Sequence, residues 1–162
     1  MLKNERPTFY YKNKPVRASG ILFYIIEDNK YIFLLRKVNN RWEDLGGKTD
    51  IKDKDYLETA VREATEETNN KLLDKDDSYN DCYYKIKGLV INDSKKIYIY
   101  NSKYLLYLVK LDNDIKNLSM TRFGLYEKHD NKDHYFRWIC RLNNLHPRLP
   151  MRNILYKLKN NK

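Results

Sequence analysis

The stretch Arg62–Thr68, REATEET, places three carboxylates within five residues of one another. The chain around it has 162 residues and a formal net charge of +10, so a cluster of acidic residues is unusual in this sequence. On a helix with about 3.6 residues per turn, Glu63, Glu66 and Glu67 project from one face. Carboxylates this close repel one another, and a divalent cation with oxygen ligands relieves the repulsion. A solvated acidic helix face is the plain alternative, and the flanking residues decide between the two.

The residues before the acidic cluster predict the helix that carries it. Asp55, followed three positions later by Glu58, is typical of a capped helix start. Apolar or small side chains then recur at helical spacing: Leu57, Ala60, Val61, Ala64 and Thr68. Asn69 follows, and Asn tolerates the left-handed conformation that often ends a helix. We expect a helix over about 55–68 that packs its apolar stripe onto a sheet.

Short apolar runs on both sides of this helix predict strands. Ala18–Asp28, ASGILFYIIED, is continuous and rich in Ile and aromatic residues, as is typical of a strand buried on both faces. Asn29–Lys37, NKYIFLLRK, is its expected hairpin partner, with Asp28-Asn29 as the turn. The polar residues 69–81 are expected to form a loop. Four later segments are expected to be strands: 82–91 (CYYKIKGLVI), 95–101 (KKIYIYN), 103–111 (KYLLYLVKL) and 135–139 (YFRWI).

Basic residues are concentrated at the two ends of the chain. Residues 1–19 carry five Lys or Arg against one Glu, and residues 137–162 carry seven basic residues and no acid. Residues 20–136 hold 20 basic and 21 acidic residues. The last segment predicts a basic amphipathic helix at about 148–160, with Pro150 in its first turn. Such charge suits a polyanion such as nucleic acid, inositol phosphate or an anionic membrane, and a merely solubilising surface explains it equally well.

The composition restricts the class of protein. With 41% hydrophobic and 33% charged residues, the chain fits one globular domain over residues 1–162. The longest apolar run, Ile21–Ile26, is too short to cross a bilayer, and no apolar signal-peptide region begins the sequence. Cys82 and Cys140 are too few for a disulfide framework. We therefore expect an intracellular, cytoplasmic protein without a membrane partner.

The segment Gly46–Asn69, GGKTDIKDKDYLETAVREATEETN, resembles the box that defines the Nudix hydrolase family. The core of that box is Arg-Glu, an apolar residue, any residue and Glu-Glu. Residues 62–67, REATEE, match the core without a mismatch, and residues 46–48, GGK, match the opening. Two apolar strands expected before the box also agree with the family, so the resemblance extends to most of the chain.

The box departs from the family pattern in two places. Arg62 lies fifteen positions after Gly47, one more than usual, so the first glutamate of the box has no fixed counterpart. Asp53 or Asp55 could stand in for it. Asn69 replaces the terminal glycine. By the resemblance, Arg62 is a supporting residue that holds a carboxylate of the box in place.

The resemblance implies a fold and a chemistry. Nudix hydrolases are α/β/α sandwiches, of class α+β or α/β, with a mixed central sheet and the box helix packed on it. They use Mg²⁺ or Mn²⁺ to hydrolyse substrates in which a nucleoside diphosphate is linked to another group. By resemblance, Glu66 and Glu67 are the principal metal ligands, and Glu63 ligates or acts as general base. The carbonyl group of Gly46 or Gly47 completes the metal shell.

Residues outside the box are expected to complete the site. Nudix hydrolases often recruit one more acid, and Glu127 is our candidate for a catalytic residue beside Glu63 and Glu67. It lies in a polar loop, 127–133, that we expect to be exposed. Substrate contacts are expected from side chains chosen for charge or aromatic surface: Arg17, Lys48, Tyr126 and Arg148.

The box leaves the substrate open. Capped mRNA, cleaved within its 5′ cap, is the first hypothesis, because the basic ends could follow an RNA backbone and the 15 Tyr, 5 Phe and 2 Trp could stack on bases. The compact build also looks like that of the mRNA-decapping Nudix enzymes of large DNA viruses. Small anionic substrates, such as dinucleoside polyphosphates or diphosphoinositol polyphosphates, are the alternative. A catalytically silent, RNA-binding Nudix fold is the non-enzyme alternative, although the box has lost no carboxylate.

Overall fold

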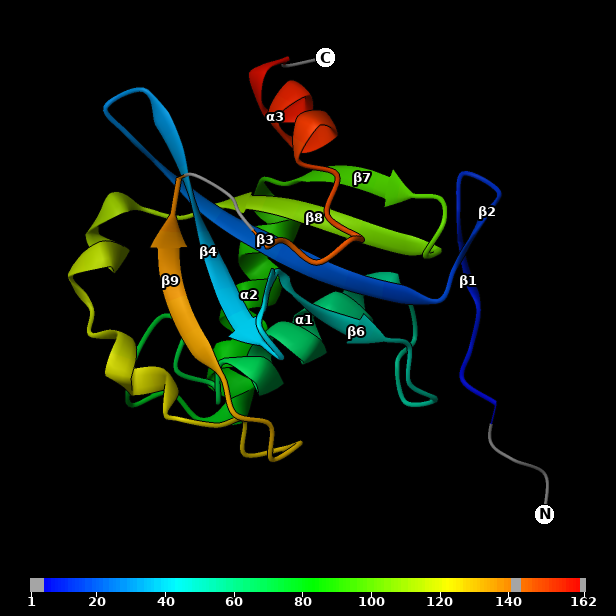
Figure 1. The fold of residues 1–162 in the computed structure, drawn as a ribbon. Coiled ribbons are helices and arrows are strands. Elements are labelled where there is room, and N and C mark those ends of the chain that lie inside the picture. Colours follow the sequence, from blue (N-terminus) through cyan, green and yellow to red (C-terminus); the bar gives the residue numbers. More distant parts are fainter. Residues whose placement is uncertain (1–4, 141–143, 161–162) are drawn as a thin grey trace.

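The chain forms a mixed main sheet with helices on both of its faces (Figure 1). The structure is a computed structural model that describes residues 5–140 and 144–160. Within these residues the helices are α1 (Tyr56–Glu67), α2 (Tyr79–Asn92) and α3 (Met151–Lys159). Two short 3-10 helices, Asn113–Asn117 and Met120–Phe123, lie between the last two strands of the chain.

Seven strands are hydrogen-bonded into the main sheet. Its central order is β5 (Arg41–Glu43), β4 (Lys30–Val38), β3 (Ala18–Glu27), β8 (Tyr104–Lys110) and β7 (Lys95–Ile99). In addition, β6 (Leu45–Lys48) pairs with β3, and β9 (Tyr135–Ile139) pairs with β4. Strands β3 and β8 run parallel, whereas the other pairs of the described sheet are antiparallel. A separate hairpin, β1 (Phe9–Tyr11) and β2 (Lys14–Val16), precedes the sheet.

Strand β3 is buried on both faces, and its alternating side chains belong to two separate core clusters. Ile21, Phe23 and Ile25 pack in one cluster with α1 and α2, whereas Leu22 and Tyr24 pack in the other with α3. The helical partners in the first cluster are Ala60, Val61, Ala64, Cys82, Ile86 and Val90, and those in the second are Ile154 and Leu158. The expected α/β/α sandwich, with a mixed sheet and the acidic helix packed on it, is confirmed.

Helix α1 begins and ends as its sequence predicts. The Asp55 side chain caps the helix by accepting a hydrogen bond from the Glu58 N–H group at 2.8 Å. Asn69 follows the C-cap with a positive φ of 51°. The predicted β3–β4 hairpin is also present, and Asp28 and Asn29 turn it with φ values of 51° and 61°. Positive φ at both turn residues is what a two-residue hairpin requires.

The strand predicted at 82–91 is wrong, because this segment lies within helix α2. Ser78 caps the helix by accepting from the Asp81 N–H group, and the Asp81 carboxylate accepts in return from the Ser78 N–H group. The buried side chains recur every four residues: Cys82, Ile86 and Val90. Tyrosine and β-branched residues favour strands, but here the helical period of burial prevails over that composition. The expected loop 69–81 is correspondingly shorter and ends at Ser78.

The predicted C-terminal helix is present as α3 and begins after Pro150. Its lysines, Lys157 and Lys159, lie in the last turn, where a positive charge is favourable. None of the helices in the described residues is long and apolar enough to span a bilayer.

Candidate active site

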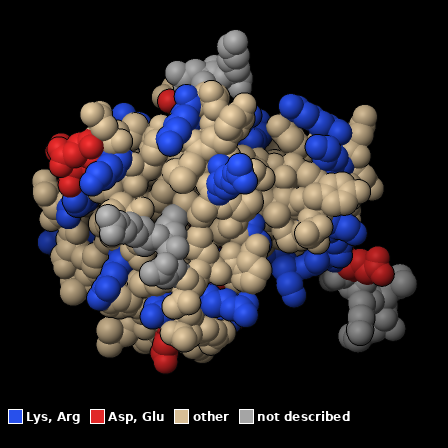
Figure 2. All heavy atoms as spheres, turned by 45° about the horizontal axis from the view of Figure 1, so that its top comes forward, with Lys and Arg blue, Asp and Glu red and all other residues tan. Residues whose placement is uncertain are grey.

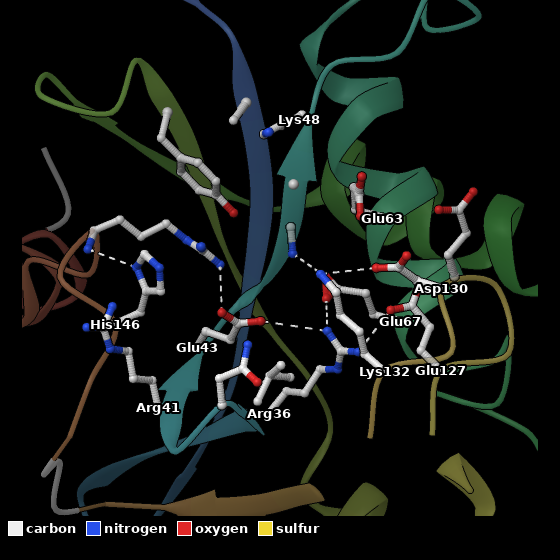
Figure 3. Close-up of a pocket in the computed structure, with 18 of the residues that line it drawn as sticks. Arg36, Arg41, Glu43, Lys48, Glu63, Glu67, Glu127, Asp130, Lys132 and His146 are labelled. Carbon is white, nitrogen blue, oxygen red and sulfur yellow. Dashed lines mark hydrogen bonds and ion pairs between the residues drawn. The ribbon is translucent and has the colours of Figure 1, made fainter. Parts of the chain in front are cut away.

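A cavity of about 870 Å³ opens between α1, β6, the β4–β5 hairpin and two loops (Figure 3). Six carboxylates line it: Glu43, Glu63, Glu66, Glu67, Glu127 and Asp130. Its basic lining residues are Arg36, Arg41, Lys48, Arg62, His129, Lys132, His146 and Arg148. The cavity thus brings three glutamates of α1, Glu63, Glu66 and Glu67, together with Glu127, which lies 60 positions later in the chain than Glu67.

The glycine pair of β6 allows the glutamates of α1 to approach the sheet. The Gly46 N–H group donates a hydrogen bond to Glu67 Oε1 at 2.6 Å. A Cβ atom built on Gly47 would lie 2.6 Å from the carboxyl carbon of Glu63. A side chain at position 47 would therefore displace that carboxylate, and the Gly-Gly sequence follows from this close approach.

Arg62 binds a carboxylate outside α1 as well as two within it. Its Nε and Nη2 atoms donate to the Asp53 carboxylate at 2.9 and 3.0 Å. Its Nη1 atom donates to Glu63 at 3.0 Å and to Glu66 at 3.3 Å. Of the two residues that could stand in for the first box glutamate, Asp55 caps the helix and Asp53 pairs with Arg62. The guanidinium holds the three carboxylates in fixed positions.

Arg36 of β4 is a buried cation that the sequence interpretation missed. It contacts Glu67 through Nη1, donates to Glu127 Oε2 through Nη2 at 2.9 Å, and lies 3.6 Å from Glu43. Its Nε atom donates to His134 Nδ1 at 3.2 Å, and only 2% of the residue is exposed. The sequence does contain one signal for this residue. An arginine inside the apolar run KYIFLLRKV requires a buried partner for its charge.

Glu127 is 4% exposed, which corrects the expectation that its loop is exposed there. The loop is tied to the end of α1 by Asn69. The Asn69 Nδ2 atom donates to the carbonyl oxygens of Phe123 and Tyr126 at 2.6 and 2.9 Å, and Oδ1 accepts from the Lys128 N–H group at 2.8 Å. A glycine at position 69 could end the helix equally well but could not hold the loop. This explains the departure from the box pattern.

Burial raises the pKa values of three of the glutamates of α1: Glu63, Glu66 and Glu67. It raises the pKa of Glu63 to about 7, with Glu66 and Glu127 adding to the shift and Arg62 opposing it. Burial also raises the pKa of Glu66, against the effect of Arg62. It raises the pKa of Glu67 well above the ordinary range, although Arg36 opposes the shift. Burial therefore disfavours the ionised form of all three carboxyl groups, and the arginines only partly offset this effect.

The four predicted substrate residues divide into two that line the cavity and two that do not. Lys48, at the end of β6, and Arg148 are in the lining. Arg17 is outside it and donates instead to two oxygens of residues 6–8 at 2.7 and 2.9 Å. Tyr126 is also outside the lining, with 47% of its surface exposed.

A second buried ion pair forms the wall opposite α1. Asp44, which is fully buried, accepts from Arg148 Nε and Nη2 at 3.0 and 2.8 Å and from the Tyr104 hydroxyl. The Arg148 guanidinium also lies 5.0 Å from the centroid of the Tyr104 ring. These contacts attach residues 144–150 to the junction of β5 and β6. The sequence interpretation missed Asp44, because one acid between two short strands has no recognisable pattern.

Within the described residues, no three His, Cys, Asp or Glu side chains already surround a common point that could hold a metal ion. The glutamates of α1 instead contact arginines or a backbone N–H group. Two histidines lie next to these groups: His134 is buried against Arg36, and His129 Nε2 lies 3.7 Å from Glu66.

Two solved structures share a distant likeness with this chain, which matches no protein-family model and none of the curated proteins. The first is a binary complex of C. elegans Ap4A hydrolase, which is 18% identical to this chain with a TM-score of 0.41. The matched region covers 90% of this chain and 88% of the hydrolase chain. A further structure of C. elegans Ap4A hydrolase is 19% identical, with coverages of 76% and 80% and a TM-score of 0.36. At these values the likeness carries no argument about function.

Proposed function

We propose that the chain is a Nudix hydrolase that cleaves a phosphoanhydride bond with the help of a divalent metal ion. One observation carries the proposal: Glu63, Glu66 and Glu67 from α1 and Glu127 from a distant loop line a single cavity. Burying so many carboxylates together is unfavourable unless cations compensate them. A protein that keeps this arrangement beside an open cavity is well suited to bind a cation together with an anionic substrate.

The oxygen donors in this cavity fit Mg²⁺ or Mn²⁺. Glu63, Glu66 and Glu67 would hold the ion, together with a carbonyl group of Gly46 or Gly47. When bound, such an ion would neutralise the phosphates and activate water for attack on phosphorus. Burial raises the pKa values of these carboxyl groups, and a bound divalent cation would offset this by favouring the ionised carboxylates.

The remaining residues position these groups. Arg62 orients Glu63 and Glu66, and Arg36 orients Glu67 and Glu127. The proton of the attacking water is accepted by Glu63, Glu67 or Glu127. All three residues line the cavity, and glutamine variants identify the one that accepts the proton.

Among the possible substrates, the cavity favours a small polyphosphate, such as a dinucleoside polyphosphate. A volume of about 870 Å³ lies within the range of small-molecule sites. Two of the residues expected to contact the substrate, Arg17 and Tyr126, lie outside the lining. The charged residues of the site are therefore concentrated in a bounded space instead of along an extended track.

Capped mRNA is the second candidate, and one observation favours it. Figure 2 shows that Lys and Arg side chains are spread over the face that carries α3, whereas acidic side chains lie near its edges. A nucleic-acid backbone could follow such a surface to the cavity. RNA binding would lose affinity steeply with salt, whereas a small ligand would lose it less steeply.

A substrate panel tests the proposal. Purified protein is incubated with Mg²⁺ or Mn²⁺ and with diadenosine polyphosphates, nucleotide sugars, diphosphoinositol phosphates, cap analogue or cap-labelled RNA. We expect metal-dependent hydrolysis of at least one substrate and none after chelation. Metal-independent RNA binding, with no hydrolysis of any substrate, would instead establish the silent RNA-binding alternative.

Replacement of Glu67 by Gln separates a specific site from a general effect of charge. We expect E67Q to lose roughly 10²–10⁴ in rate if this residue is the general base. E58Q is the matched control, because Glu58 lies on the same helix outside the cavity lining and should leave the rate unchanged. Mn²⁺ binding, followed by electron paramagnetic resonance, should weaken in E67Q and not in E58Q.

A further inference from the structure

Most basic side chains in the cavity are already bound to carboxylates. Five have a carboxylate as an ion-pair partner: Arg36, Arg62, His129, Lys132 and Arg148. Within the described residues, three basic lining residues have no such partner: Arg41, Lys48 and His146. These three have hydrogen-bonding capacity that the folded protein itself does not use.

Two of these residues are brought together by the backbone. The Trp42 N–H group donates to the Asn144 carbonyl at 2.9 Å, and the His146 N–H group donates to the Trp42 carbonyl at 2.8 Å. Residues 144–146 thus run beside β5, and His146 lies close enough for the Arg41 charge to help lower its pKa, after burial and Arg148. Figure 3 shows Arg41 and His146 on one side of the cavity and Glu63, Glu67 and Glu127 on the other.

The tautomer of His146 follows from its backbone contact. The Arg148 N–H group donates to His146 Nδ1 at 3.2 Å, so Nδ1 is an acceptor and the proton of the neutral ring is on Nε2. Within the described residues, Nε2 has no hydrogen-bond partner. His146 is therefore a hydrogen-bond donor toward a ligand, beside the guanidinium of Arg41, which has five donor N–H groups.

We propose that Arg41 and His146, with Lys48 at the rim, bind a second phosphate group of the substrate, away from the phosphoanhydride bond that is cleaved. The inference rests on the proposed function, because it places the bond to be cleaved at the glutamates. The cavity is then divided by charge. The carboxylate side holds phosphate through a metal ion, and the opposite side holds phosphate directly through N–H donors.

This division selects among substrates. A polyphosphate chain that extends beyond the cleaved bond presents an anion to Arg41, whereas a nucleotide sugar presents an uncharged ring. The structure therefore favours a substrate with at least one phosphate group beyond the two that the cleaved bond joins.

Direct binding of inorganic tripolyphosphate tests the site without requiring hydrolysis. Titration calorimetry with excess Mg²⁺ compares the wild type with Arg41→Ala, Arg41→Lys and Arg152→Ala. Arg152 is an exposed residue of α3 outside the cavity, so its replacement makes the same change in net charge. We expect R41A to weaken binding about tenfold, the size of one charge-assisted hydrogen bond, and R41K to recover part of the loss. R152A should change the dissociation constant less than twofold.

Equal loss in R41A and R152A, or no loss in R41A, would overturn the proposal, as would a wild type that does not bind tripolyphosphate. With an active enzyme, R41A should raise the KM of a dinucleoside tetraphosphate about tenfold while kcat and the KM of a nucleotide sugar stay within twofold. If R41A leaves hydrolysis unchanged, the proposed phosphate site is wrong and the proposed hydrolase activity stands. If tripolyphosphate binding depends on Arg41 but the protein hydrolyses no substrate, the proposed phosphate site stands and the proposed hydrolase activity is wrong.

Discussion

Arg36 and Glu127 are 91 positions apart in the chain and form a buried ion pair at 2.9 Å. The same guanidinium contacts Glu67, so one arginine on the central sheet joins the acidic helix to a distant loop. Both carboxylates are almost fully buried and depend on this cation for charge compensation.

Replacement of Arg36 by Met should destabilise the protein by about 3–5 kcal/mol, because it leaves buried carboxylates without a cation. Urea denaturation near neutral pH measures the free energy of unfolding. Lys30→Met is the control on the same strand, since Lys30 is exposed, and its effect should stay within about 0.5 kcal/mol. Similar losses in the two variants would contradict the role assigned to Arg36.

Replacement of Asn69 by Gly should preserve helix α1 and weaken the loop that carries Glu127. Glycine adopts the positive φ of this position readily, but three side-chain hydrogen bonds to the loop are lost. We expect hydrolysis to fall about 10–100-fold, as for other residues that orient a catalytic group. Amide exchange of residues 124–133 should become faster.

Asn70→Gly is the matched control for this experiment. Asn70 also has a positive φ, of 52°, but its side chain donates to the Asp77 carbonyl instead of the Glu127 loop. In this variant, the rate of hydrolysis and the amide exchange of residues 124–133 should both remain as in the wild type. Unchanged exchange in N69G would show that the loop is held by other contacts.

Replacement of Gly46 by Ala should be strongly destabilising. A Cβ atom at this position would overlap the Tyr104 hydroxyl and lie 2.6 Å from Gly20 Cα and 2.8 Å from the Ser19 carbonyl oxygen. Two of these contacts are with backbone, which cannot move aside, so we expect a loss of about 3 kcal/mol or more. Gly88→Ala in α2 has no atom within 4 Å and should instead stabilise by about 0.5–1 kcal/mol. Thermal melting of the two variants should shift in opposite directions.

Asp53 should determine part of the acid stability of the fold. Burial opposes ionisation of its carboxyl, but hydrogen bonds from Arg62, the Asp50 N–H group and Thr59 prevail and lower its pKa. A lowered folded-state pKa stabilises the protein above the unfolded value of about 3.9, and this stabilisation is lost as the pH falls through the folded value. Asp53→Asn should therefore reduce stability near neutral pH and flatten its decline below about pH 4.

Denaturation curves collected from neutral to acidic pH measure this difference. Asp114→Asn, at an exposed position of the first 3-10 helix, should retain the wild-type dependence on pH. An Asp53→Asn curve parallel to that of the wild type would show that other carboxyl groups dominate the acid transition.

The sequence predicted the parts of the structure that follow from local periodicity. The helix that carries Glu63, its caps at Asp55 and Asn69, and the β3–β4 hairpin are all present. Helix α2 was misread as a strand because its tyrosines and β-branched residues masked a four-residue period. The capping pair Ser78 and Asp81 was a local signal that would have corrected this.

The contacts that complete the cavity could not be read from local patterns. Arg36 meets its carboxylates only because β4 passes beside α1 in the folded sheet. Arg41 and His146 lie on neighbouring segments because residues 144–146 run along β5. Pairings of this kind depend on topology, which sequence periodicity does not encode. The charge of Arg36 inside an apolar strand indicated a partner but did not identify it.

The two core clusters on opposite faces of β3 allow catalysis and substrate preference to evolve separately. Phe23 supports helix α1, which carries Glu63, Glu66 and Glu67, whereas Leu22 and Ile154 support the segment that contributes His146 and Arg148. Repacking on the α3 side can thus reshape what the protein accepts and leave its reaction intact. Relatives with the same glutamates and a different C-terminal segment are expected to share the reaction and to differ in substrate specificity.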